Sequence, residues 1–237
     1  MRRKTSTLFK IMAKEFRKDI VFSVFLMVCV DFIYANFTGI RLAGESGMIL
    51  WQGGNDANPF GFSTVLLKLL NVSIVLVAVG KMADQLSDRM MLYILARITD
   101  YRRFLYAYSA VIFLSGEALL TVSHIVYACF AGFGPEQAAP SLFYLLMDDL
   151  GFAGILMLYI ILQNVFSVEN SFLYILAVYL LHTVLPFPIL PAMSTVRFFE
   201  LKGRIGNLAV ILFIAGMDLV IAIIYHMFIQ KRRVDLC

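Results

Sequence analysis

The sequence predicts an all-α integral membrane protein with six transmembrane helices, an N-terminal interfacial amphipathic helix and one further cytoplasmic helix. Composition is the first observation behind this fold class: of 237 residues, 61% are hydrophobic and only 15% are charged. The mean hydropathy is +0.83. A typical soluble domain has about 25% charged residues, so a soluble fold of this size could not bury the apolar excess. The second observation is a series of long apolar segments.

Six segments approach the roughly 20 apolar residues that a helix needs to cross a bilayer. The fourth is interrupted by Asp148 and Asp149, which we interpret as an outer helix break, with a cation site as the alternative. The fifth ends at a run of prolines from Pro186, which removes backbone donors and prevents a regular helix from continuing. The predicted spans are residues 20–40, 61–82, 104–130, 142–166, 172–190 and 207–229.

Basic residues gather on one side of this predicted bundle. The N-terminal tail holds seven Lys and Arg, the stretch from Lys81 at the end of the second span to Arg103 before the third holds five, and the C-terminal tail holds three. Because Lys and Arg are enriched in cytoplasmic segments, we predict a multi-pass protein with both termini in the cytoplasm. The net charge of +4 reflects this placement and does not indicate a nucleic-acid partner.

The tails have their own predicted structures. Within residues 1–19, Leu8, Phe9 and Met12 fall on one helical face and basic residues on the other. Such a helix lies on the inner membrane surface, with its basic face toward anionic lipid headgroups. A charged tail that only fixes orientation is the alternative. Residues 230–237 are predicted to form a basic cytoplasmic tail.

A second amphipathic segment, about residues 84–103, follows the second span. Met90, Ile94 and Ile98 recur at helical spacing, so one face is apolar. The segment also carries more charge than hydrocarbon accepts. We therefore predict a short helix at the cytoplasmic surface that packs on the bundle and presents charge to something outside it. Its charged residues after Gln85 are Asp88, Arg89, Arg97, Asp100, Arg102 and Arg103.

This layout resembles the permease subunits of type-two ATP-binding-cassette (ABC) exporters, particularly small six-span members linked to bacteriocin or antimicrobial-peptide export and immunity. Locally the resemblance lies in DRMMLYILARITDYRRFLYAY, residues 88–108. In that family the corresponding helix is the coupling helix, which docks into a groove on the ATPase. The resemblance thus implies a set of ATPase-facing residues: Asp88, Arg89, Arg97, Tyr101, Arg102 and Arg103.

The resemblance also implies partners and a location. Residues 20–229 would form the permease domain, with an outer re-entrant or interfacial segment at about 187–203. The permease would be a homodimer, or a heterodimer with a related permease, in a bacterial cell membrane. A large extracellular domain is missing, which departs from lipoprotein-type exporters. The expected activity is export. The resemblance favours a peptide as the cargo, with a lipid or a small drug as alternatives.

Nothing in the sequence suggests that the chain hydrolyses ATP by itself. The phosphate-cradling motif GxxxxGK[ST] does not occur, and this motif is what positions backbone N–H groups around nucleotide phosphates. ATP and Mg are therefore expected on a partner ATPase subunit, with no cofactor and no catalytic residue in this chain. The three cysteines, Cys29, Cys129 and Cys237, show no metal-ligand spacing and give no disulfide framework.

Ionisable side chains also fall inside the predicted spans. Asp31, Glu117 and Asp218 lie near the middle of their spans, where an ionised carboxylate costs at least about 2.5–3.5 kcal/mol on insertion scales. Glu117 and His124 are seven residues apart, and Asp218 and His226 are eight apart, so each pair is expected on one helix face. Two interpretations stay open: a translocation or proton path, and hydrogen bonding between helices.

Two alternative functions come from other classes. An ion- or proton-coupled secondary carrier would use Asp31, Glu117 and Asp218 as coupling carboxylates. Such carriers usually show inverted repeats or helices broken at mid-membrane, and the sequence shows neither. A membrane scaffold or immunity protein that transports nothing is the other alternative.

Overall fold

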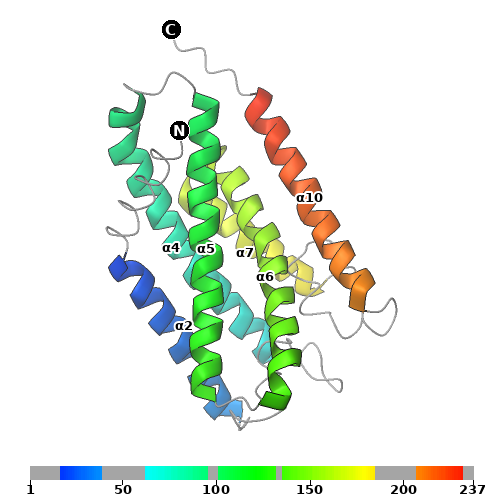
Figure 1. Ribbon diagram of the computed structural model, residues 1–237. Helices are drawn as coiled ribbons and strands as arrows, with labels where there is room; N and C mark the ends of the chain where they lie inside the picture. Colours follow the sequence, from blue (N-terminus) through cyan, green and yellow to red (C-terminus); the bar gives the residue numbers. More distant parts are fainter. Residues whose placement is uncertain (1–16, 39–61, 96–100, 132–134, 185–206, 232–237) are drawn as a thin grey trace.

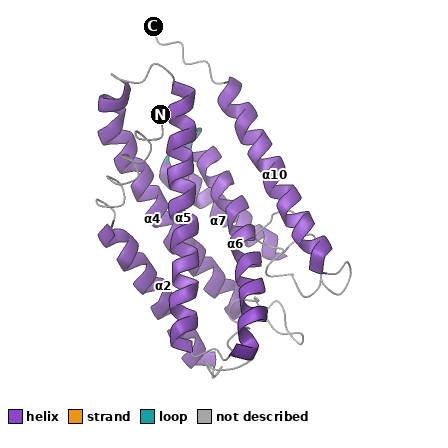
Figure 2. Cartoon of the chain, in the orientation of Figure 1, coloured by secondary structure: helices purple, strands orange, loops and turns teal. Residues whose placement is uncertain are grey.

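Six α-helices and no β-strand form the part of the chain that this computed structural model describes, residues 17–38, 62–95, 101–131, 135–184 and 207–231 (Figure 1). Figure 2 shows the same helices coloured by secondary structure. The predicted all-α class is therefore confirmed for these residues, and each predicted span falls mainly on one helix. The helices are α2 (Arg17–Thr38), α4 (Phe62–Leu95), α5 (Tyr101–Ala131), α6 (Pro135–Gln163), α7 (Val168–Val184) and α10 (Asn207–Lys231).

Two of the described helical stretches are long and apolar enough to cross a membrane. They are Leu105–Val126 in α5 and Ile211–Ile229 in α10. Asp149–Gln163 in α6 and Val168–Tyr179 in α7 are apolar but shorter. Membrane association is indicated by these stretches, whereas the count of six spans stays a prediction.

The outer surface of the bundle carries many large apolar side chains. On α10, Leu208, Leu212 and Leu219 are each more than 60% exposed, and Phe22 and Phe25 on α2 are each 64% exposed. Soluble monomers rarely expose large contiguous apolar patches, and helices that face water place polar residues on that side. The exposed faces of α2 and α10 therefore suit contact with lipid.

Successive helices run in alternating directions (Figure 1). Helix α5 packs against α2, α4, α6 and α10, helix α4 also packs against α2 and α7, and α6 also packs against α7 and α10. With this alternation, the end of α4, the start of α5 and the end of α10 lie at one end of the bundle (Figure 1). This is the end that the charge pattern of the sequence assigns to the cytoplasm.

One apolar core joins α2, α4, α5, α6 and α7. Met27, Leu76, Ile112 and Leu156 in this core have no exposed surface. Among the described residues of α10, one apolar side chain, that of Tyr225, packs against this core. Helix α10 thus lies at the side of the bundle and contributes less to its centre than the other helices do.

Glycines allow the closest helix contacts in the core. A Cβ at Gly116 of α5 would lie 2.7 Å from Leu156 Cδ1 of α6. A Cβ at Gly80 of α4 would lie 2.5 Å from Tyr159 Oη of α6 and 2.8 Å from Val168 Cγ1 of α7. Small residues at such contacts let neighbouring backbones approach each other, which is common where helices pack in membranes.

The expected separate helix at about 84–103 is wrong for the residues that the structure describes. Residues 84–95 continue α4 without a break, and α5 begins at Tyr101. The reason is local: residues 81–95 contain neither Gly nor Pro and are rich in Leu and Met, which favour helix. Once a helix exists, each added residue gains a backbone hydrogen bond. The 34 residues of α4 span about 50 Å.

The predicted helix break at Asp148–Asp149 is also wrong. Helix α6 runs through both positions from Pro135 to Gln163. An aspartate inside a helix costs only about 0.7 kcal/mol relative to alanine, and it keeps the backbone N–H that proline lacks. The side chain of Asp149 also contacts α5, so the acidic residue is accommodated without interrupting the helix.

Several predicted segments lie outside the described residues. They comprise residues 1–16 of the expected interfacial helix, the expected outer segment at 187–203 and residues 232–237 of the tail. Residues 17–19 belong to α2, and residues 230–231 belong to α10.

Candidate functional site

Of the six residues predicted to face an ATPase, the five that the structure describes lie at one end of the bundle. Asp88 and Arg89 belong to the last turns of α4, and Tyr101, Arg102 and Arg103 form the first turn of α5. The end of α4 and the start of α5 lie at the same end of the molecule (Figure 1). The structure therefore brings these two groups of residues to one end of the fold, and Arg97 lies outside the described residues.

A charged contact also ties α2 to α4. Lys81 Nζ of α4 donates a hydrogen bond of 2.7 Å to Asp19 Oδ1 of α2. The two side chains are 53% and 34% exposed, so solvent screens the pair and its contribution to stability is about 0–1 kcal/mol. The contact joins the start of α2 to α4. Lys81 is next to Met82, which is buried in the core.

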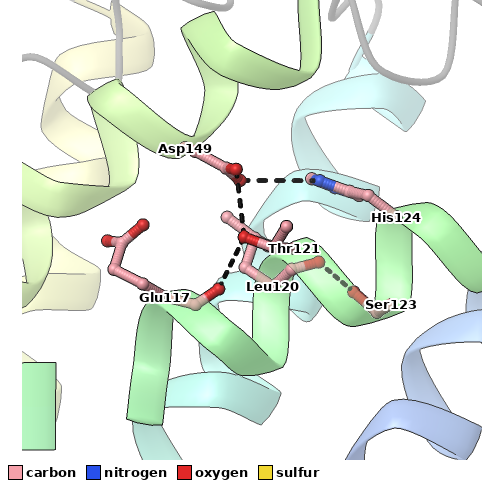
Figure 3. A network of polar contacts seen from close by, with 6 residues as sticks. All are labelled: Glu117, Leu120, Thr121, Ser123, His124 and Asp149. Carbon is pink, nitrogen blue, oxygen red and sulfur yellow. Dashed lines mark hydrogen bonds and ion pairs between the residues drawn. The ribbon is translucent and has the colours of Figure 1, made fainter. Parts of the chain in front are cut away.

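A polar cluster lies between α5 and α6, and we call Glu117, Thr121, His124 and Asp149 the α5–α6 polar cluster (Figure 3). Thr121 Oγ1 lies 3.0 Å from Asp149 Oδ2 and 2.9 Å from the backbone oxygen of Glu117. His124 Nδ1 lies 3.9 Å from Asp149 Oδ1. Figure 3 shows the side chains of Glu117, Thr121 and His124 on the side of α5 that faces α6.

The geometry of this cluster limits its chemistry. At 3.9 Å the His124–Asp149 contact is too long for a hydrogen bond, and it is an ion pair only if the imidazole is protonated. Thr121 has one hydroxyl proton, so it can donate to one of its two acceptors at a time. The cluster therefore brings two carboxylates, an imidazole and a hydroxyl together at the contact between α5 and α6, and the hydrogen bond from Thr121 to Asp149 joins the two helices.

Sequence reasoning identified Glu117 and His124 but not their neighbours. It missed Thr121 as a site residue, although positions 117, 121 and 124 follow the four-three spacing of one helix face. Asp149 was considered only as a helix break or a cation site. Its place beside Thr121 and His124 depends on how α5 and α6 are rotated against each other, which the spacing within one helix does not contain.

Asp31 forms a second buried polar contact. The residue lies on α2 and is 4% exposed, and its Oδ1 accepts a hydrogen bond of 2.8 Å from Asn71 Nδ2 of α4. This pairing fits the interpretation of hydrogen bonding between helices, because an amide donor from a neighbouring helix partly offsets the cost of burial. The structure keeps Asp31 and the α5–α6 polar cluster on different helix pairs.

Asp218 and His226 do not share an environment, contrary to the sequence prediction. Asp218 is 8% exposed, and neither of its carboxylate oxygens has a hydrogen-bond partner in the described structure. His226 is exposed, and its Nδ1 lies 2.6 Å from Tyr106 Oη of α5. Eight residues turn an α-helix by about 80° beyond two full turns, and this rotation places His226 at the edge of the buried stripe.

The second half of α10 is held to α5 by polar contacts between their side chains. Ser109 Oγ and Tyr225 Oη form a short hydrogen bond, next to the His226–Tyr106 contact. The rings of Tyr106 and Tyr225 also meet edge to face, with centroids 6.5 Å apart. These contacts attach α10 near the end of the bundle where α5 begins.

The described residues contain no group of three or more His, Cys, Asp or Glu side chains that could hold a metal ion. No protein-family model, curated protein or solved structure matches this chain. The resemblance to exporter permeases therefore stays a prediction from the sequence, and the helical bundle with its two membrane-length stretches is the structural finding on which a function can be proposed.

Proposed function

We propose that this chain is the permease subunit of an ATP-driven exporter, with six spans, both termini in the cytoplasm and ATP hydrolysis in a separate subunit. The observation that carries the proposal is the unbroken helix α4. Its 34 residues exceed by about 14 the 20 that cross a bilayer. The first half of α4 is apolar and suits the membrane. The additional residues therefore lie in its second half, which contains Asp84, Asp88 and Arg89.

A continuous helix is suited to transmitting force. Val75, Leu76 and Val79 of α4 are buried in the core and contact neighbouring helices there. The same helix continues to Leu95 without a hinge. A displacement applied to the end of α4 would therefore move side chains in the middle of the bundle, because a helix is stiff over such lengths and a packed core transmits strain. In the proposed exporter, closure of the ATPase supplies that displacement.

Helix α5 extends the same argument. It begins with Tyr101, Arg102 and Arg103 at the end where α4 stops, and it packs against α2, α4, α6 and α10. The ATPase would therefore act on two adjacent helix ends. A movement of α5 would shift the α5–α6 polar cluster, which we propose as part of the polar lining along which cargo passes in a dimer of permeases.

The proposal is tested by purifying the protein in mild detergent from membranes of the cells that produce it. We expect a nucleotide-binding chain to accompany it in similar amount. Replacing both Arg102 and Arg103 with Glu should remove that chain by reversing the charge of the docking surface, while membrane insertion stays unchanged. The matched control, Arg232→Glu with Arg233→Glu, makes the same charge change in the C-terminal tail and should retain the partner.

Two results would contradict the proposal. One is a purified assembly that contains no nucleotide-binding chain, although transport remains measurable in the same cells. The other is equal retention of that chain by the 102/103 and 232/233 charge-reversal variants, because docking would then not involve the start of α5.

A further inference from the structure

Asp218 lies in the buried stripe of α10. Ile214, Asp218, Ile221, Tyr225 and Ile229 follow one another at steps of four, three, four and four residues, which keeps them on one helix face. The three isoleucines are at most 7% exposed. This face packs against α6 and α5, so the carboxyl group is enclosed between apolar residues at a helix interface.

Both carboxylate oxygens of Asp218 lack a hydrogen-bond partner within the described structure. Two other acidic groups each accept a hydrogen bond: Asp31 accepts one from Asn71, and Asp149 accepts one from Thr121. An ionised carboxylate that is buried without a donor is costly, and a neutral carboxylic acid is much less so. Of these three groups, Asp218 is the one whose surroundings most strongly favour a bound proton.

Titratable groups on the neighbouring helices do not compensate its charge. The side chains of Tyr106 and Tyr225 are engaged with His226 and Ser109, and Tyr108 Oη donates to the backbone oxygen of Ala83. None of the described titratable groups on α5, α6 and α10 forms a hydrogen bond or ion pair with Asp218. They are Tyr106, Tyr108, Glu117, His124 and Cys129 on α5, Asp149 and Tyr159 on α6, and Tyr225 and His226 on α10.

Helix α10 is also less enclosed by the bundle than α5. Only 17% of its membrane-length stretch is buried, compared with 44% for the stretch in α5. Of the buried and half-buried apolar side chains described in α10, only Tyr225 packs against the common core. The polar contacts described above hold its second half to α5, whereas Asp218 lies in its first half. A shift of that half would expose the carboxyl group with little loss of core packing.

We propose that Asp218 is a proton-binding site that controls how α10 docks on the bundle. While α10 is docked, one carboxylate oxygen carries a proton and the group is neutral. When α10 moves away, the carboxylic acid releases that proton to water and becomes a hydrated carboxylate. Docking is favoured at low pH and weakened as the pH rises. This inference does not depend on an ATPase partner, and it assigns a ligand, the proton, to a site that the proposed function does not use.

The test measures access to the buried face of α10. Ile214→Cys is introduced into a full-length chain whose native cysteines are replaced by serine, and the chain is reconstituted in lipid vesicles. A small thiol reagent is added over a range of pH to this protein and to the same protein carrying Asp218→Asn. Because thiolate formation raises both rates equally, the ratio of the two rates reports the effect of Asp218.

We expect this ratio to rise with pH by up to about tenfold per pH unit, the limit for an equilibrium linked to one proton. Leu219→Cys is the control: residue 219 is 62% exposed on the opposite face, so its ratio should stay constant. Asp218→Glu keeps a titratable group and should retain the pH dependence, which also covers the case in which Asp218→Asn inserts poorly. A ratio at residue 214 that is independent of pH would overturn the proposal, as would an equal rise at residue 219.

Discussion

A hydrogen bond from Thr121 of α5 to Asp149 of α6 links these two helices. Its length is 3.0 Å, and it gives the half-buried carboxylate a donor from the neighbouring helix. Hydrogen bonds between helices in membranes contribute about 0.6 kcal/mol on average and up to about 1.7 kcal/mol. Because the donor serves an acidic group, we place this one toward the upper value.

Thr121→Val tests that contact, because it removes the hydroxyl and nearly preserves the shape of the side chain. The free energy of unfolding in detergent should fall by about 1–1.7 kcal/mol. Thr121→Ser keeps the hydroxyl and should lower the free energy of unfolding by a clearly smaller amount. Equal losses for the two variants would show that the methyl group, rather than the hydrogen bond, is what matters at this position.

At the scale of helices, glycine decides how closely α5 and α6 approach. Gly116→Ala would place a methyl group 2.7 Å from Leu156 Cδ1 and 3.3 Å from Val79 Cγ2. Leu156 has no exposed surface, so it cannot move aside without disturbing the core, and overpacking costs about 1–3 kcal/mol. Unfolding measured in detergent should show a net loss of stability.

Gly216→Ala in α10 is the matched control for that substitution. A Cβ at Gly216 meets no atom within 4 Å, and alanine favours helix over glycine by about 0.5–1 kcal/mol. This variant should therefore be neutral or slightly more stable. If Gly116→Ala were equally well tolerated, the close contact between α5 and α6 would be refuted.

We also predict that α4 continues as one helix beyond its apolar first half, to Leu95. Spin labels at Val77 and Leu95 are separated by eighteen residues, and at 1.5 Å per residue their backbones should lie about 27 Å apart along the axis. Pulsed EPR on the protein in lipid would give a narrow distribution near that value. A broad or much shorter distribution would indicate that the segment folds back as a separate surface helix.

The sequence allowed the six helices to be predicted because each contains a long apolar run, which has few other stable forms in a membrane. It did not reveal that α4 continues past residue 84, because an amphipathic stripe such as Met90 and Ile94 suits both a surface helix and a helix extension. The absence of Gly and Pro there was the better signal.

Contacts between helices were less predictable than the helices themselves. Asp31 pairs with Asn71, and Asp149 pairs with Thr121. Each pairing depends on the rotation and depth of two helices, and neither can be derived from spacing along one of them. The separation of Asp218 from His226 has the same origin, since a small rotation decides which side of the buried stripe a residue occupies.

At the scale of the whole molecule, the fold combines two properties that fit a permease. Its outer faces on α2 and α10 are apolar, whereas acidic groups such as Asp31 and Asp218 are enclosed. Alternation of the helices places the ends of α4 and α10 and the start of α5 together (Figure 1). A soluble protein that docks at this end would contact helices that reach into the core.

The most direct test of the central claim is photocrosslinking in living cells. A photoreactive amino acid is placed at position 88 in the end of α4, at position 102 in the start of α5, and at position 232 in the tail as a control. The account predicts that positions 88 and 102 crosslink to a nucleotide-binding protein and that position 232 does not. Crosslinks from positions 88 and 102 to lipid alone, or reaction of these positions with a reagent that cannot enter the cell, would contradict it.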